Sequence, residues 1–405
     1  MADDIRIDKI TMRESIRNSL DRLYSQNYIG RNGDTYNFLT DEEQDIQKGI
    51  SEINVDTASI VEKIANLIYG DIYTSSKFRY DNKYDFAFDK MVDGISIGAY
   101  TGGMRLRFLT DATDPSEKSE FSLMASSGGE AVVVLAEGSY FQNIEKELKI
   151  RKYAKQRNMS QLPEQIRNII HMQLSEADNC EKLAIEGIIS AIENGVFYVD
   201  GEKLTVTGDY KNKIEQALNY LVSNVYSELN LITRNAESEA DIVAILHGAD
   251  SDGIMDGLEY NKDAAIKMEE YLEMQAAKNY PTSMADIQSR YKAKPYGWRE
   301  IDIAAVAAHL IYEQKVTIKY AGNTNQPNNP RLPDMLHKKS EIAKTLISKR
   351  LVVSVQKIKQ VKEILREYFD VMDIPTDEDG LIEFVVNEFS ELKKHYEELS
   401  DRYKG

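Results

Sequence analysis

Residues 1–75 carry a pattern of helix, tight hairpin and helix that constrains the fold more strongly than any other stretch. The hairpin is predicted by Asn32-Gly33, because this dipeptide supplies the two positive φ angles of a type I′ turn. Thr40 and Glu43 form a capping box, which predicts a long helix from there to about Tyr69. Apolar residues with helical spacing predict the first helix, which has Thr11 as its expected N-cap and a stripe of Ile16, Leu20, Leu23 and Tyr24. Residues 1–75 are therefore interpreted as a partial winged-helix-like unit.

A change from helical to strand-like spacing after Tyr69 predicts a small β-sheet domain at residues 76–139. The stretches KFRYDNKYDFAF and MRLRFLT alternate in polarity, and AVVVLA is a short apolar run. Helical periodicity returns at Tyr140, so residues 140–260 are predicted to be a helical domain with an inserted β-hairpin that turns at Asp200-Gly201. The acidic end of this segment, from Glu237 to Tyr260, is expected to include a surface loop.

A second winged-helix-like unit is predicted at residues 261–322, where two helices, a Pro-Tyr-Gly-Trp turn, a third helix and a strand follow one another. The tract AGNTNQPNNPRLP then predicts a linker, because prolines and asparagines interrupt both helical and strand patterns. Residues 323–405 are interpreted as this linker and the C-terminal helices. The predicted fold class is α+β, mostly helical, with a small β-sheet domain and two winged-helix-like units.

Three blocks of the chain resemble, in the same order, stretches of a known family. They are the opening block, the segment KFRYDNKYDFAFDKMVDG, and KPYGWREIDIAAVAAHLIYEQKVTIKY. The family is that of the large P-loop proteins of BREX phage-defence systems, of the BrxC or PglY kind, and the resemblance covers most of the 405 residues. It implies a part in an anti-phage complex, with other BREX proteins or the remainder of a parent chain as partners. It does not imply ATPase chemistry here, since the family's nucleotide-binding motif lies upstream of the matched region, and the chain is expected to be a fragment of such a protein.

Charge and cysteine content narrow the function classes. A formal net charge of -17 argues against a polyanion binder that uses its whole surface, although a local basic patch is compatible with it. Cys180 is the single cysteine, which excludes an internal disulfide framework and a cysteine-rich zinc site. No apolar stretch approaches the roughly 18 residues of a membrane-spanning helix, so a cytoplasmic protein with no membrane partner is expected.

No stretch carries a complete catalytic, cofactor or metal signature. The glycine-rich segment 98–105 has Met104-Arg105 where a phosphate-binding loop requires Lys and Ser or Thr, so it is interpreted as a loop between strands. The acidic segment 250–253 lacks the glycine position of an EF-hand and is interpreted as a solvated loop. The five histidines are too far apart for a local metal pair. We therefore predict no catalytic, cofactor-binding or metal-binding residue, no cofactor, and no enzymatic activity of this chain itself.

Arginines in the first unit make nucleic acid a candidate ligand. In a winged helix that reads DNA, the helix before the wing carries Arg, Lys, Asn or Gln on its exposed face. The candidate contacts in this unit are Arg13, Arg17 and Arg22 on the helix and Arg31 on the wing. The second unit offers Arg299 beside Glu300, Asp302 and Glu313, whose carboxylates would face phosphates with the wrong sign. It is interpreted as a protein-contact module.

A basic block next to an acidic block marks the C-terminal part. From Arg331 to Arg366 there are ten Lys or Arg against three acidic residues, whereas Glu367 to Ser400 holds eleven acidic residues against two lysines. The basic block can bind a polyanion, or the two blocks can neutralise each other across an antiparallel helix pair, which we favour. The candidate phosphate contacts here are Lys338, Lys339, Lys349 and Arg350.

The expected function is a non-catalytic scaffold or partner-binding region of a BREX-type P-loop ATPase acting in defence against bacteriophage. The alternative is a nucleic-acid-binding winged-helix module of the same system. An enzyme in its own right is a distant third.

Overall fold

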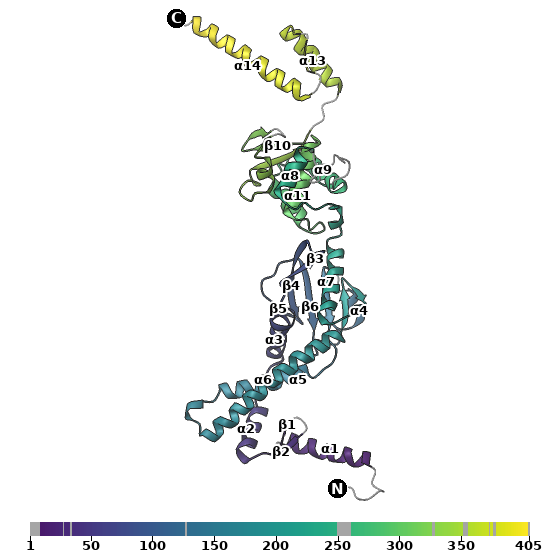
Figure 1. Ribbon diagram of the computed structural model, residues 1–405, viewed down its shortest axis with the longest axis vertical. Helices are drawn as coiled ribbons and strands as arrows, with labels where there is room; N and C mark the ends of the chain where they lie inside the picture. The colour runs from purple at the N-terminus through teal and green to yellow at the C-terminus, as the bar shows by residue number, and fades with distance from the viewer. Residues whose placement is uncertain are drawn as a thin grey trace. The chain divides into compact units, whose positions relative to one another are not determined.

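The chain divides by its internal contacts into two units, each described here by itself (Figure 1). Unit 1 comprises Met1–Leu229 with Lys294–Tyr296, and unit 2 comprises Asn230–Ala293 with Gly297–Gly405. The computed structural model describes residues 9–26, 28–32, 35–125, 128–248, 261–325, 329–350, 355–371, 373–375 and 378–403. Helices dominate both units and sheets are small, which confirms the predicted α+β, mostly helical class.

Unit 1 opens with the predicted order of helix, hairpin and helix. Its first elements are α1 (Lys9–Ser25), β1 (Ile29–Asn32), β2 (Thr35–Phe38) and α2 (Asp41–Ser51). The capping box is confirmed: Glu43 N–H donates to Thr40 Oγ1 at 3.3 Å, and Thr40 N–H donates to Glu43 Oε2 at 2.8 Å. Thr11 is not the cap of the first helix, because α1 already includes Lys9. The hairpin register pairs Asn32 with Thr35, so Asn32 belongs to the strand, and Gly33 lies outside the described residues.

The long helix predicted up to Tyr69 is wrong, because the chain breaks it at residues 52–56. A new helix, α3 (Thr57–Leu67), begins there and continues as one π-helical segment, η1 (Ile68–Ile72). Asp56 starts it, since its carboxylate accepts the backbone N–H of Ser59 at 2.7 Å. Asp is a preferred N-cap residue, so Asp56 was a usable sequence signal for this second helix start.

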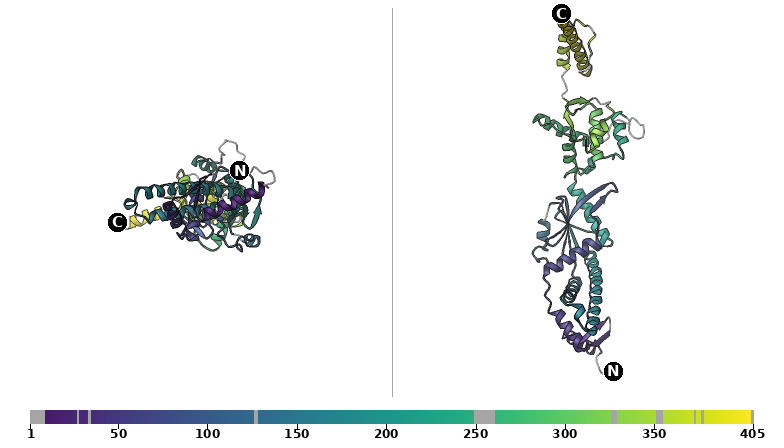
Figure 2. Two further views of the ribbon diagram at one scale, coloured as in Figure 1. Left: turned by 90° about the horizontal axis from the view of Figure 1, so that it is seen from below. Right: turned by 90° about the vertical axis from the view of Figure 1, so that its left-hand side faces the viewer.

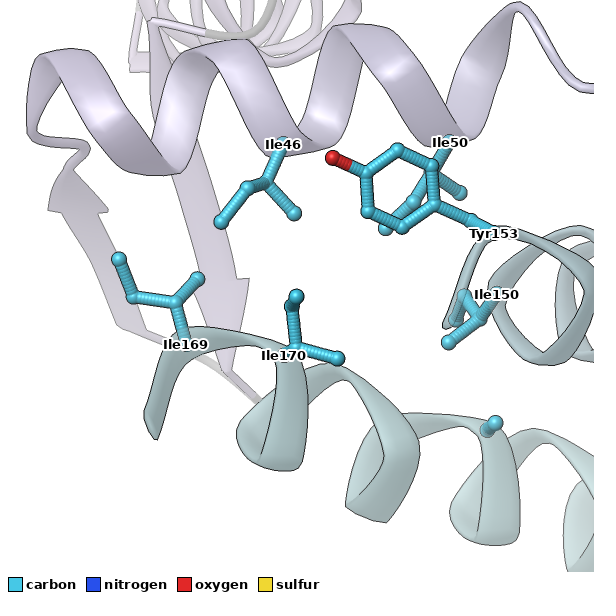
Figure 3. Close-up of a cluster of buried hydrophobic side chains, with 7 residues drawn as sticks. Ile46, Ile50, Ile150, Tyr153, Ile169 and Ile170 are labelled. Atoms are coloured by element: carbon cyan, nitrogen blue, oxygen red, sulfur yellow. The ribbon is translucent and has the colours of Figure 1, made fainter. Parts of the chain in front are cut away.

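Two long helices join the N-terminal helices to the sheet of unit 1. They are α5 (Tyr140–Lys155) and α6 (Glu164–Glu193), which pack side by side (Figure 2). Figure 3 shows the apolar cluster that α2 shares with them. Its labelled members are Ile46, Ile50, Ile150, Tyr153, Ile169 and Ile170. Burial of these side chains is what fixes α2 against the long pair.

One mixed sheet forms the centre of unit 1 and, within the described residues, contains seven strands. They are β3 (Lys77–Tyr80), β4 (Tyr84–Val92), β5 (Ile95–Ile97), β6 (Met104–Leu109), β7 (Glu130–Val134), β8 (Val196–Val199) and β9 (Glu202–Leu204). The order is β3-β4-β6-β7-β8-β9, with β5 on β4, and only the β4-β6 and β6-β7 pairs are parallel. Helix α4 (Glu120–Ala125) lies between β6 and β7 in the chain, and α3 and α7 (Tyr210–Val225) pack against the sheet.

The hairpin at Asp200-Gly201 therefore completes this sheet, instead of standing inside a helical domain as predicted. Strand β8 pairs antiparallel with β7, and three of its four residues are buried. The turn itself is as predicted, since φ is 51° at Asp200 and 85° at Gly201. The boundary predicted at residue 139 does not separate two bodies, because β7 and β8 are hydrogen-bonded across it.

Unit 2 contains a winged helix that extends further at both ends than the predicted 261–322. Its elements are α8 (Glu239–Leu246), α9 (Lys262–Ala277), α10 (Met284–Lys292), α11 (Glu300–Tyr312), β10 (Val316–Tyr320), β11 (Asn323–Asn325), α12 (Leu332–His337) and β12 (Thr345–Lys349). The strand order is β11-β10-β12. Strand β11 and the start of helix α12 lie in the tract predicted to be a linker, and β12 completes the wing. Helix α8 occupies part of the acidic interval 237–260, and residues 249–260 lie outside the described residues.

Two helices follow the wing, α13 (Val355–Phe369) and α14 (Glu378–Tyr403). An apolar cluster of Leu365, Ile374 and Leu381 joins them near their connection. None of the helices in the described residues is both long and apolar enough to cross a membrane.

Candidate nucleic-acid interface

The helix before the wing of unit 2, α11, is enclosed along most of its length. It packs against α8, α9, α10, α12 and β10. Nine of its thirteen residues are buried among the described part of the chain, including the continuous run from Asp302 to Ala308. A run of seven residues covers almost two helical turns and so points in every direction around the axis. A winged helix that reads DNA lays this helix in the major groove, and α11 has no open face for that purpose.

The buried carboxylate of Asp302 fastens α11 to the segment before α8. Asp302 is completely buried, and its carboxylate accepts Arg299 Nε at 2.7 Å and Arg299 Nη2 at 2.9 Å. The same carboxylate accepts the backbone N–H of Ala236 at 2.8 Å and Asn235 Nδ2 at 3.2 Å. The expectation that Asp302 would face phosphates is wrong. The Asp302 carboxylate is fully hydrogen-bonded within the domain, and these bonds hold the segment before α8 against α11.

Glu269 on α9 pairs with two lysines beside the wing. Lys349 on β12 donates to Glu269 on α9, and Lys315 lies 3.6 Å from the same carboxylate. Burial alone would raise the pKa of Glu269, but the two ammonium groups outweigh it and hold that pKa below its usual value. These lysines are neutralised inside the domain and are poorly placed to release counterions from DNA.

The other predicted cations of this domain are also mostly engaged. Lys338 Nζ lies 2.6 Å from Asp334 Oδ1 on α12. Arg350 Nη1 donates to Gln314 Oε1 at 3.4 Å, while its backbone N–H donates to the carbonyl of Lys315 at 2.9 Å. Lys339 is exposed. The predicted pairing of the whole basic block with the acidic helix is wrong for Lys338 and Lys349, whose partners belong to the winged helix.

The predicted cations on α1 are exposed but do not share one face. Arg13, Arg17 and Arg22 lie on α1, and within the described residues they form no ion pair. Arg13 and Arg22 are nine residues apart, which is two and a half turns, so they point to opposite sides of the helix. Arg31 lies on β1, and its side chain is outside the described part of the structure. Only Arg13 and Arg17 are neighbours on one side.

The glycine-rich segment is a loop between β5 and β6, as predicted, although its last two residues, Met104 and Arg105, begin β6. Two of its backbone N–H groups are already engaged, because the buried carboxylate of Asp89 accepts Thr101 N–H at 2.5 Å and Gly102 N–H at 3.2 Å. A phosphate-cradling loop needs such groups free for its ligand. The acidic segment 250–253 lies outside the described residues. Across the described ranges, no group of three or more His, Cys, Asp or Glu side chains is arranged to hold a metal ion.

The sequence did not reveal the two residues that neutralise or bury charge in the winged helix, Asp302 and Glu269. Asp302 and Glu269 looked like two among 67 acidic residues. The spacing of Arg299 and Asp302 at i and i+3 was a usable signal for a local pair. Nothing local indicated that α8 would cover α11 or that Glu269 would meet Lys349, which is 80 residues away.

Three family models match the chain in succession. Residues 53–221 match the BREX ATP-binding protein BrxC 4th domain with six-stranded beta sheet. Residues 228–351 match the BREX ATP-binding protein BrxC winged helix-turn-helix domain, and residues 357–405 match the BREX ATP-binding protein BrxC alpha helical domain. No solved structure matches the chain. The first match spans the sheet that includes β8 and β9, and the second ends beyond β12, in agreement with the observed fold. The chain belongs to the BrxC family of BREX phage-defence proteins.

Proposed function

We propose that this chain is a non-catalytic scaffold or partner-binding region of a BREX-type P-loop ATPase, acting in the cytoplasm with other BREX proteins or the remainder of a parent chain. The enclosure of α11 carries the proposal. A helix that is covered by α8 and α12 and pinned by Asp302 has lost the surface with which a winged helix reads DNA. The domain is then a packing module whose outer surface contacts protein.

The apolar surface of α1 supports a contact with another protein. Within the described residues α1 has no buried member, although its sequence carries an apolar stripe. Ile16 is 50% exposed and Tyr24 44% exposed, and Phe38 on the neighbouring hairpin is 84% exposed. Exposed apolar side chains grouped on one element mark an interaction surface. The partner that fits is a BREX protein with an apolar face for this helix.

Co-elution with purified BREX proteins tests the scaffold role. The full chain is mixed with each BREX protein of the same system in turn and analysed by size-exclusion chromatography. We expect a complex with at least one of them, weakened at least about tenfold by Ile16→Asp with Tyr24→Asp. Ile266→Asp, which changes a 41% exposed isoleucine on α9, serves as the control and should leave the complex intact. Absence of a complex with every BREX protein would contradict the proposal.

The proposal includes the absence of ATPase activity in this chain. Its glycine-rich loop has no Lys-Ser/Thr pair for phosphate and magnesium, and Asp89 occupies two of the loop's backbone N–H groups. We expect the purified chain to release no phosphate from ATP above the buffer rate. Turnover that a single substitution within the chain abolishes would overturn this part.

Nucleic-acid binding stands as the second candidate because of α1. Arg13 and Arg17 are exposed neighbours that form no ion pair among the described residues, so they are available to phosphate. Two such contacts provide weak, salt-sensitive binding without sequence preference.

A further inference from the structure

Helix α14 carries a seven-residue apolar repeat that its neighbour cannot cover. Positions a are Ile382, Phe389, Tyr396 and Tyr403, and positions d are Val385, Leu392 and Leu399. This 3.5-residue period is typical of a helix that packs along another helix in a coiled coil. The repeat runs through about three heptads, to the last described residue of the helix.

Helix α13 contacts only the first part of this repeat. Its Phe369 meets Phe384 and Phe389 edge-on, with ring centroids 6.2 and 5.0 Å apart. At 1.5 Å per residue, its 15 residues reach along little more than half of the 26-residue α14. Tyr396 is 62% exposed and Tyr403 88% exposed. The second half of this apolar repeat, which we call the apolar seam, is therefore not packed against α13.

On the g edge of the apolar repeat the charges are complementary in an antiparallel arrangement, and on the e edge Lys393 is paired with Glu397 of its own helix. Glu388 and Arg402 both occupy position g, fourteen residues apart on the same edge of the seam. In an antiparallel coiled coil, position g of one helix faces position g of the other. We consider the register in which Phe389 lies opposite Leu399, and Leu392 opposite Tyr396. In this register Glu388 of each copy lies opposite Arg402 of the other. Neither residue forms an ion pair within the described part of the chain.

We infer that two copies of this chain associate through α14, packed antiparallel about a twofold axis near His395. A second copy fits better than an unrelated helix, because α14 itself provides both of the side chains that meet in each apolar contact and both members of each ion pair. The two central layers, which α13 does not reach, set Tyr396 against Leu392 of the other copy. Phe389 lies opposite Leu399 in the next layer outward and keeps its edge-on contact with Phe369 of α13. The remaining acidic residues of α14 lie mostly at outer positions and stay in water.

This inference rests on the proposed scaffold role, because it names one partner of the scaffold. The two can fail separately. A monomeric chain that still binds a BREX protein would refute only the self-association, and a dimeric chain that binds no BREX protein would refute only the wider role.

The mass of the full chain in solution tests the association. Light scattering after size exclusion, from about 1 to 100 µM at physiological salt, should show a rise from 46.1 kDa towards twice that mass. Tyr396→Asp should weaken the dimer at least about tenfold, because it places a carboxylate in two apolar layers. The control is Tyr280→Asp, which changes a tyrosine of similar exposure, 64%, outside α14 and should leave the mass unchanged. Circular dichroism verifies that both variants are folded.

A charge exchange tests the antiparallel register. Glu388→Arg alone and Arg402→Glu alone each set like charges opposite one another and should weaken the dimer severalfold. The double variant restores two opposite-charge pairs and should return the dimer to near the parent dissociation constant. A monomer at every concentration, or a dimer that Tyr396→Asp leaves unchanged, would overturn the association. A double variant no stronger than the single ones would overturn the antiparallel pairing.

Discussion

At the scale of residues, a few buried polar side chains decide what the surface of the winged helix can do. Asp302 is completely buried and satisfied by Arg299 and by two groups of the segment before α8. Glu300, two residues earlier in the same helical turn, pairs with Lys292 at the surface. The two carboxylates share the favourable position at the helix N-terminus, so they differ chiefly in burial.

Asp302→Ala should lower the free energy of unfolding of the winged helix by about 2–4 kcal/mol, because it removes the buried acceptor of the Ala236 N–H and the carboxylate that pairs with the partly buried Arg299 guanidinium. Glu300→Ala is the matched control and should cost at most about 1 kcal/mol, as exposed pairs do. Urea unfolding followed by the fluorescence of Trp298 measures both. Trp298 is the only tryptophan of the chain and is 2% exposed, so it reports on this domain. Equal effects of the two substitutions would refute the role given to Asp302.

At the scale of elements, local sequence signals predicted caps and turns correctly, but the sequence did not predict which distant elements pack together. The capping box at Thr40 and the Asp200-Gly201 turn are both as predicted, because each depends on residues a few positions apart. The body that the turn belongs to was wrong, since pairing of β8 with β7 joins residues more than 60 positions apart. The break before α3 was missed although Asp56 signals it locally.

Gly201→Ala should destabilise unit 1 by about 1–3 kcal/mol, because φ is +85° and an added Cβ would lie 2.6 Å from the Met124 carbonyl oxygen. Gly94→Ala is the control in the same sheet, since a Cβ there meets no atom within 4 Å, and it should change stability by at most about 1 kcal/mol. Thermal unfolding followed by circular dichroism gives both values. A Gly201→Ala protein as stable as the control would refute the turn geometry.

At the scale of the whole molecule, the sequence predicted the family, the fold class and the presence of a winged helix. It did not show which cations of the candidate interface are free. The ten basic residues of the C-terminal block were expected either to bind a polyanion or, preferably, to pair with the acidic block, but folding pairs Lys349 with Glu269 and Lys338 with Asp334. Such pairings depend on tertiary contacts, which a charge count along the chain does not contain.

The central claim is that this chain presents a protein-binding surface in place of a DNA-reading winged helix. The most direct measurement is titration of labelled duplex DNA with the full chain at about 50 and 150 mM salt. We predict no saturable binding at the higher salt up to tens of micromolar protein, because most of α11 is enclosed and Lys315 and Lys349 are paired with Glu269. The variants are Arg13→Glu with Arg17→Glu, and Lys393→Glu with Lys394→Glu as the control of equal charge change. Micromolar, salt-sensitive binding that only the first pair abolishes would contradict the account and make nucleic-acid binding through α1 the function of this region.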